Sequence, residues 1–148
     1  MILLLTYAKS NKPASPNRLG DYKSKYQQIQ RDEPKLDYPQ SKAGFYLDLN
    51  PLPGAIDAFR ILEQHYEVYI LTAPSYMNPR CYTEKRIWVE HYFDIETTKN
   101  LILCRRKGLL KGNYLIDDHP YPEFEGKQLV YGSSDYKNWS DVLRYFNL

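Results

Sequence analysis

Five short apolar runs constrain the fold of this chain more than any other feature of its sequence. Each run has four to six residues, which suits a buried strand better than a helix. Helical patterns or short polar crossovers separate the runs, and such alternation is typical of a parallel sheet that is covered on both faces. The sequence therefore predicts an α/β, Rossmann-like fold. The predicted strands are residues 2–7, 67–72, 101–104, 114–117 and 128–131.

Three amphipathic helices are predicted among these strands. A Pro-Leu-Pro-Gly turn at 51–54 precedes the first helix. Asn78 can cap the second helix, with Pro79 in its first turn. The third helix closes the chain. Their apolar positions recur at helical spacing and are Ala55, Ala58, Phe59, Leu62 and Tyr66; Trp88, Val89, Tyr92 and Phe93; and Trp139, Val142, Leu143 and Phe146.

Length, charge and cysteine content restrict the class of protein. The 148 residues predict a single domain, spanning 1–148, that buries a core without disulfides. A net charge of +2 gives no electrostatic reason to expect nucleic acid or a membrane as a partner. Cys81 and Cys104 show no disulfide or metal pattern, so packing and a reducing compartment are expected. The apolar start at 1–7 is too short for a signal peptide or a membrane span, so we expect a cytoplasmic protein.

Asp117 and Asp118 are the most specific chemical signal in the sequence, because they lie at the end of a predicted strand. Ligands of parallel α/β sheets bind at the carboxyl ends of the strands. Two adjacent carboxylates cannot both be buried without partners, and a divalent cation such as Mg²⁺ would relieve that cost. The alternative is a solvated pair in a loop, or a cap for the next segment.

Thr72, Lys107 and Lys85 are weaker candidates. Thr72 ends one predicted strand, and Lys107 follows another within Arg-Arg-Lys-Gly. A lysine near a metal site can hold a phosphate, and a threonine hydroxyl with nearby backbone N–H groups can bind the same phosphate. Taken alone, Thr72 is as well explained by a structural role, Lys107 by a solvated basic turn, and Lys85 by a solvated helix face. The three histidines show no metal spacing.

Several ordered motifs together resemble the 5'(3')-deoxyribonucleotidase family of the haloacid-dehalogenase-like phosphatase superfamily. The resemblance extends from about Asp21 to the C-terminus. Gly44–Ala55 resembles the segment that returns from the family's small cap, and residues 21–43 would form a reduced cap. The other motifs are Ile70-Leu-Thr-Ala-Pro74, Glu84-Lys-Arg-Ile-Trp-Val89, Arg105-Arg-Lys107, Tyr114-Leu-Ile-Asp-Asp118 and Trp139-Ser-Asp-Val-Leu143.

This resemblance implies a Mg²⁺-dependent nucleotidase that hydrolyses (deoxy)nucleoside monophosphates. Thr72 and Lys107 would be catalytic, and Asp117 and Asp118 would hold Mg²⁺. The expected phosphate and substrate contacts are Thr72, Ala73, Lys85 and Lys107, with Phe45 and Tyr46 near the base.

The family also uses an Asp-x-Asp motif after its first strand, and these 148 residues contain none. In that motif the first Asp attacks phosphorus and the second acts as acid and base. If residues 2–5 are the first strand, the two positions fall near Leu5 and Tyr7; a gap-free count back from Asp21 places them at Ala14 and Pro16. Two hypotheses follow: an impaired member of the enzyme family, with an abrupt change before Asp21 such as a shifted reading frame or a misplaced start, or a non-catalytic phosphate- or nucleotide-binding protein.

Overall fold

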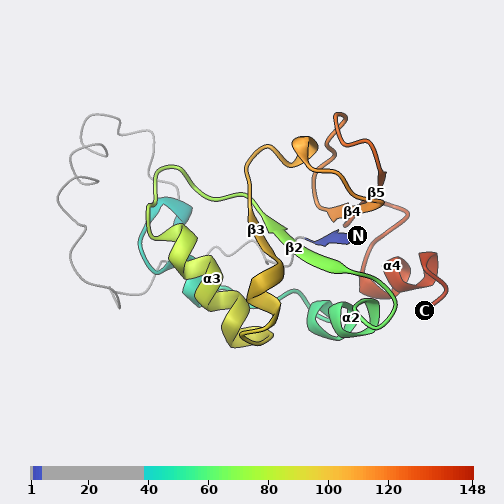
Figure 1. The fold of residues 1–148 in the computed structure, drawn as a ribbon, viewed down its shortest axis with the longest axis horizontal. Helices are drawn as coiled ribbons and strands as arrows, with labels where there is room; N and C mark the ends of the chain where they lie inside the picture. Colours follow the sequence, from blue (N-terminus) through green and yellow to red (C-terminus); the bar gives the residue numbers. More distant parts are fainter. Residues whose placement is uncertain (1, 5–38) are drawn as a thin grey trace.

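The computed structural model of this protein describes residues 2–4 and 39–148 (Figure 1). Five parallel strands form one sheet in the order β3-β2-β1-β4-β5. The α/β fold with a parallel sheet is therefore confirmed. The strands are β1 (Ile2–Leu4), β2 (Val68–Thr72), β3 (Leu101–Leu103), β4 (Tyr114–Asp117) and β5 (Lys127–Val130).

β1 is the central strand, although it comes first in the sequence. Ile2 pairs with Val68 of β2 on one side and with Tyr114 of β4 on the other. The strand predicted at 2–7 is confirmed over Ile2–Leu4, and positions 5–7 lie outside the described residues. The other four strands lie within one residue of their predicted bounds. Short apolar runs were sufficient to locate them because buried strands carry little other pattern.

The three predicted helices are present as α2 (Ala55–Leu62), α3 (Cys81–Tyr92) and α4 (Trp139–Tyr145). Gly54 precedes α2 with a φ of 78°, a left-handed conformation that favours glycine. Asn138 caps α4, since its side chain accepts a hydrogen bond from the Asp141 N–H at 3.0 Å. The prediction that Asn78 caps α3 needs correction, because α3 begins only at Cys81. The Asn78 side chain instead accepts from the Arg80 N–H at 3.0 Å, in the turn before the helix.

Four 3-10 helices complete the described chain, and two of them carry residues of interest below. η3 is part of the segment that precedes α2, and η5 lies between β3 and β4. Their bounds are η2 (Pro39–Ser41), η3 (Phe45–Asp48), η4 (Thr97–Asn100) and η5 (Lys107–Leu109).

The two faces of the sheet are covered differently. Residues of α2, α3 and α4 join one large apolar cluster with Val68, Ile70, Ile116 and Leu129 of the strands. The opposite face holds a smaller cluster around Leu71, Leu115 and Phe124, which the crossovers from β3 to β4 and from β4 to β5 cover. The sequence predicted helices on both faces. Within the described residues, α2, α3 and α4 cover the first face, and the crossovers on the second face contain only the short 3-10 helix η5.

The proposed single domain with a reduced cap at 21–43 stays a prediction. Residues 21–38 lie outside the described residues, and 39–43 contribute η2 and a turn. Within residues 2–4 and 39–148, no helix has the length and apolar character that a membrane crossing requires.

Candidate functional site

The carboxyl edge of the sheet gathers the polar residues that the sequence singles out. Thr72 ends β2, Asp117 ends β4, and Lys107 starts η5 in the crossover between β3 and β4. Lys85 reaches the same edge from α3, because its ammonium nitrogen donates to the Thr72 hydroxyl at 2.6 Å. All four side chains are buried. Parallel strands whose carboxyl ends share one edge bring them together from distant parts of the sequence.

Lys107 and Asp117 form a buried ion pair, with side chains only 2% and 3% exposed. Asp117 also accepts a hydrogen bond from the His119 N–H at 3.1 Å, so both of its carboxylate oxygens are engaged. Burial raises the pKa of Asp117, while the Lys107 charge opposes that shift. The solvated basic turn considered for Lys107 is therefore wrong. Asp118, in contrast, is exposed.

Lys85 is buried between a hydroxyl and an aromatic ring. Its ammonium nitrogen lies 4.2 Å from the centroid of the Tyr46 ring, in addition to its contact with Thr72. Burial, together with the nearby positive charge of Lys107, lowers the pKa of Lys85 to about 7. The expectation of a solvated Lys85 is wrong, because this face of α3 packs against the protein.

The burial of Lys85 follows from a stripe along α3 that sequence reasoning recognised only in part. The buried positions are Cys81, Glu84, Lys85, Trp88 and Val89, which recur at intervals of three and four residues. We assigned the apolar members Trp88 and Val89 to a buried face. The same spacing places Glu84 and Lys85 on that face, and this signal could have identified both.

Glu84 is the residue in this region whose role the sequence did not reveal. Its side chain is fully buried, and its carboxylate accepts hydrogen bonds from the backbone N–H groups of Gly44 at 2.7 Å and Tyr46 at 3.3 Å. Burial raises the pKa of Glu84, and these two hydrogen bonds act in the opposite direction. Glu84 thus attaches α3 to the start of η3.

A cavity of about 340 Å³ opens beside Ala73, the residue that follows Thr72. This volume lies at the small end of the range for ligand pockets. The loop after β2 supplies one wall, and Arg105 lies with its guanidinium carbon 5.4 Å from the centroid of the Tyr76 ring. The lining residues combine aromatic, apolar and polar groups, and they are Gln40, Ser41, Tyr46, Ala73, Pro74, Ser75, Tyr76, Met77 and Arg105.

The remaining predicted substrate contacts divide between this cavity and the core. Ala73 and Tyr46 line the cavity. Phe45 belongs to the large apolar cluster, where its ring packs edge-on against that of Tyr46 at 5.1 Å. Both cysteines are free, with Cys81 in the large cluster and Cys104 packed against the smaller one, as the prediction of packing roles requires.

Asp117 and Asp118 fit part of a Mg²⁺ site, since each Asp117 oxygen keeps a further lone pair beside the hydrogen bond that it accepts. Mg²⁺ usually takes one or two carboxylates and completes its coordination with waters and phosphate oxygens. The adjacent pair at the end of β4 supplies such carboxylates. Among residues 2–4 and 39–148, no three or more His, Cys, Asp or Glu side chains cluster closely enough to hold a metal by themselves.

Comparison with known proteins finds a match for most of the chain. Residues 14–147 match the family described as "5' nucleotidase, deoxy (Pyrimidine), cytosolic type C protein". A Vibrio phage KVP40 protein named as a 5'(3')-deoxyribonucleotidase is 37% identical over 105 residues, which cover 69% of this chain and 62% of the relative. The human 5'(3')-deoxyribonucleotidase, cytosolic type, is 35% identical over 102 residues, 68% of this chain and 47% of the relative. The chain thus spans less than two thirds of the length of these relatives.

Proposed function

Because the chain belongs to the 5'(3')-deoxyribonucleotidase family of α/β, haloacid-dehalogenase-like proteins, we propose that it binds (deoxy)nucleoside monophosphates at the carboxyl edge of its sheet, and that Mg²⁺ strengthens this binding. The proposal places the protein in the cytoplasm with a small-molecule partner rather than nucleic acid or membrane. It combines the family assignment with the chemistry of the buried residues.

The observation that carries the proposal is the pair of buried lysines. Lys85 and Lys107 are each 1–2% exposed, and they are close enough for the charge of one to lower the pKa of the other. Burying two neighbouring cations costs free energy, and Lys107 is already paired with Asp117. A phosphate dianion between the two ammonium groups would offset both. An anion site explains why the protein keeps this costly arrangement.

Each residue has a defined part in the proposed complex. Lys85 and Lys107 would neutralise the phosphate, and the Thr72 hydroxyl and Ala73 N–H would donate hydrogen bonds to its oxygens. The nucleoside would extend into the cavity, with Tyr46 as an aromatic wall and Phe45 supporting that ring from behind. Asp117 and Asp118 would hold Mg²⁺. When bound, the ion would offset the negative charge of the phosphate.

We further propose that the 148-residue chain hydrolyses its ligand slowly or not at all. The covalent nucleophile and the general acid of the family come from an Asp-x-Asp motif that this sequence lacks. Catalytic groups of this kind act as a unit, and losing them lowers the rate by many orders of magnitude. Lys107 and Thr72 can bind and orient a phosphate, but neither replaces the nucleophile. A non-catalytic nucleotide-binding role is therefore the second candidate function.

Titration calorimetry with deoxynucleoside 5'-monophosphates, with and without Mg²⁺, tests the binding proposal. We expect binding that Mg²⁺ strengthens and that Asp117→Asn weakens about tenfold or more. Asp94→Asn removes an exposed carboxylate at the opposite edge of the sheet and serves as the matched control, which should bind as the wild type does. If Asp117→Asn binds as tightly as the control, the metal assignment is wrong.

A phosphatase assay on the same ligands separates the two candidate functions. Release of phosphate far above the uncatalysed rate would contradict our proposal of little or no turnover and would show that the chain is an active nucleotidase. Binding without release would support the non-catalytic role. Absence of both binding and release would overturn the proposed function.

A further inference from the structure

Glu84 and Lys85 are neighbours on α3 that serve two different segments. The Lys85 ammonium contacts Thr72 at the end of β2, while the Glu84 carboxylate accepts the N–H groups of Gly44 and Tyr46. Tyr46 connects the two interactions, because its backbone N–H donates to Glu84 and its ring lies 4.2 Å from the Lys85 nitrogen. Tyr46 also lines the cavity. One turn of helix therefore fixes both the cation and the aromatic wall beside it.

A buried carboxylate is a costly way to hold a backbone segment. Burial raises the pKa of Glu84, which means that its charged form is destabilised in the fold. Hydrogen bonds from N–H groups to a carboxylate are stronger than those between neutral groups, and they fix donors more firmly. Gly44 has a φ of 88°, a left-handed conformation that opens η3. The combination holds the start of η3 at a defined position.

Trp88 makes a second attachment one turn further along α3. Its indole N–H donates to the Leu49 carbonyl at 2.7 Å, beyond the end of η3. Leu49 does not line the cavity, whereas Tyr46 does. The same helix thus holds the same segment at two points, and only the Glu84 point lies next to the cavity. This difference separates a positioning role from a purely structural one.

We propose that Glu84 is a positioning residue that holds Tyr46 against Lys85 and thereby sets the preference of the site for nucleoside monophosphates over inorganic phosphate. The ligand part of this inference rests on the proposed function. Lys85, Lys107 and Thr72 would bind either ligand. The Tyr46 ring contacts the nucleoside part, which orthophosphate lacks, so its position affects one ligand much more than the other.

Affinity for two probes tests the inference. We expect Glu84→Ala to raise the Kd of thymidine 5'-monophosphate about tenfold more than that of orthophosphate. Without Glu84 the Tyr46 ring is no longer held in contact with the nucleoside, and an aromatic contact of this kind contributes about tenfold to affinity. Glu84→Gln keeps an acceptor oxygen and should recover part of the preference. Trp88→Phe loses the other hydrogen bond to the segment and should lower stability while leaving the ratio of the two Kd values unchanged. Equal weakening of both ligands in Glu84→Ala, or an equal change of the ratio in Trp88→Phe, would overturn the proposal.

A second readout needs no ligand. Release of the Tyr46 ring lets water reach Lys85, so Glu84→Ala should raise the pKa of Lys85 toward its ordinary value. NMR titration of the lysine side chains measures it, with Lys85→Met identifying the signal. If Glu84→Ala does not fold, Glu84→Gln carries the measurement with a smaller shift in the same direction. An unchanged Lys85 pKa in the variant would contradict the positioning role of Glu84. Failure of the wild type to bind either probe would reject the proposed function, and the pKa measurement would still test the positioning role.

Discussion

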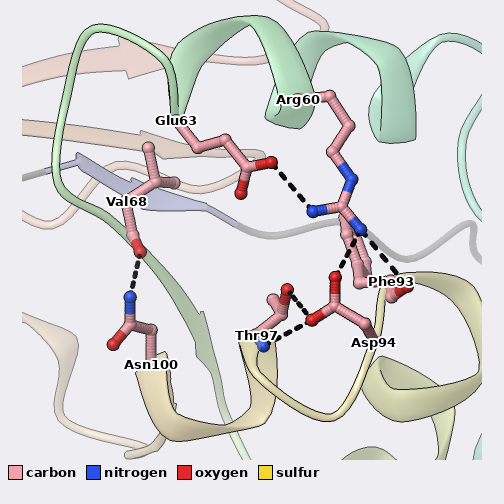
Figure 2. A network of polar contacts seen from close by, with 7 residues as sticks. All are labelled: Arg60, Glu63, Val68, Phe93, Asp94, Thr97 and Asn100. Carbon is pink, nitrogen blue, oxygen red and sulfur yellow. Dashed lines mark hydrogen bonds and ion pairs between the residues drawn. The ribbon is translucent and has the colours of Figure 1, made fainter.

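Both edges of the sheet carry clusters of polar side chains, but the two clusters differ in exposure. At the amino edge, Arg60 of α2 donates to Glu63 at 2.8 Å and to Asp94 at 2.8 Å (Figure 2). Asp94 also accepts from the backbone N–H and hydroxyl of Thr97 at 2.7 and 2.8 Å. The side chains of Arg60, Glu63 and Asp94 are 36–42% exposed. Water still solvates these charges, so the network costs little and joins α2 to the segment after α3.

Four charged side chains at the carboxyl edge are buried instead. Lys85, Lys107, Asp117 and Glu84 are each at most 3% exposed. An apolar set of similar volume would stabilise a fold at least as well as a buried ion pair does. Comparison of the two edges shows that exposed ion pairs are sufficient to hold the helices and loops together at one edge of this sheet. The buried charges at the other edge support the ligand site proposed above.

Removing one member of the buried ion pair should have the largest effect on stability. Lys107→Met leaves the Asp117 carboxylate buried without its cation, and we expect the free energy of unfolding to fall by about 3–5 kcal/mol. The double variant Lys107→Met, Asp117→Leu removes both charges and should regain much of this loss. Urea denaturation of the wild type, both single variants and the double variant measures the coupling. Strictly additive losses in the double variant would show that the pair is not coupled, and the contrast between the edges would fail.

Removing the other buried lysine should stabilise the protein. The pKa of Lys85 is lowered from 10.5 to about 7, so below pH 7 the fold contains a buried cation that the unfolded chain solvates freely. As pH rises from about 7 to 10.5, the folded protein loses this proton before the unfolded chain does, and the cost disappears. Lys85→Met should therefore raise stability by about 1–3 kcal/mol at pH 6 and by less at pH 10.

Unfolding of the wild type and Lys85→Met across this pH range provides the measurement. The stabilised variant should at the same time bind phosphate more weakly, which is the expected signature of a functional charge. A variant that is less stable than the wild type at pH 6 would contradict the assigned cost of burial.

Truncating the exposed arginine at the amino edge should have a smaller effect. Arg60→Ala removes two partly exposed ion pairs, for which we expect a loss of about 0.5–1 kcal/mol. Salt should reduce this difference between variant and wild type, since mobile ions screen exposed pairs. The effect of Lys107→Met should change little with salt. Equal salt sensitivity of the two variants in urea denaturation would remove the distinction between the edges.

Acid should reveal the smallest effect, at Asp94. Hydrogen bonds from the Thr97 backbone N–H and from Arg60 lower the pKa of Asp94 from 3.8 to about 2. The depressed pKa stabilises the fold above about pH 4, and this contribution is lost as pH falls through 2. Asp94→Asn should therefore be slightly less stable than the wild type at pH 6, with the difference in melting temperature vanishing near pH 2. A difference that grows on acidification would contradict the assignment.

The sequence predicted those parts of the site that follow directly from strand position. Thr72 and Asp117 end apolar runs and Lys107 follows one, and a parallel sheet places the ends of such runs at one edge. The burial of Glu84 and Lys85 was less apparent, because charged residues on a helix are usually solvated. Glu84 and Lys85 lie at helical spacing from Trp88 and Val89, which places them on the same buried face. Their charge nevertheless favoured the prediction of a solvated position.

The sequence does not predict contacts between segments that are far apart in the chain and that lack a periodic hydrophobic pattern. Gln40 and Ser41, which line the cavity, come from a 3-10 helix with no hydrophobic repeat. The ion pair between Arg60 and Asp94 joins residues 34 positions apart. Such contacts depend on how helices and loops pack in three dimensions, and local residue patterns carry no information about that packing.

The central place of β1 determines when the chain can complete its sheet. Ile2–Leu4 is synthesised before both of its neighbours, which begin at Val68 and Tyr114. On the ribosome this apolar segment must therefore wait for Tyr114–Asp117 before it can pair on both sides. Contacts of such large separation make folding slow, and unpaired strands expose partly folded chains to aggregation. A sheet whose central strand precedes both of its neighbours in the sequence therefore keeps that strand unpaired on one side until β4 has been synthesised.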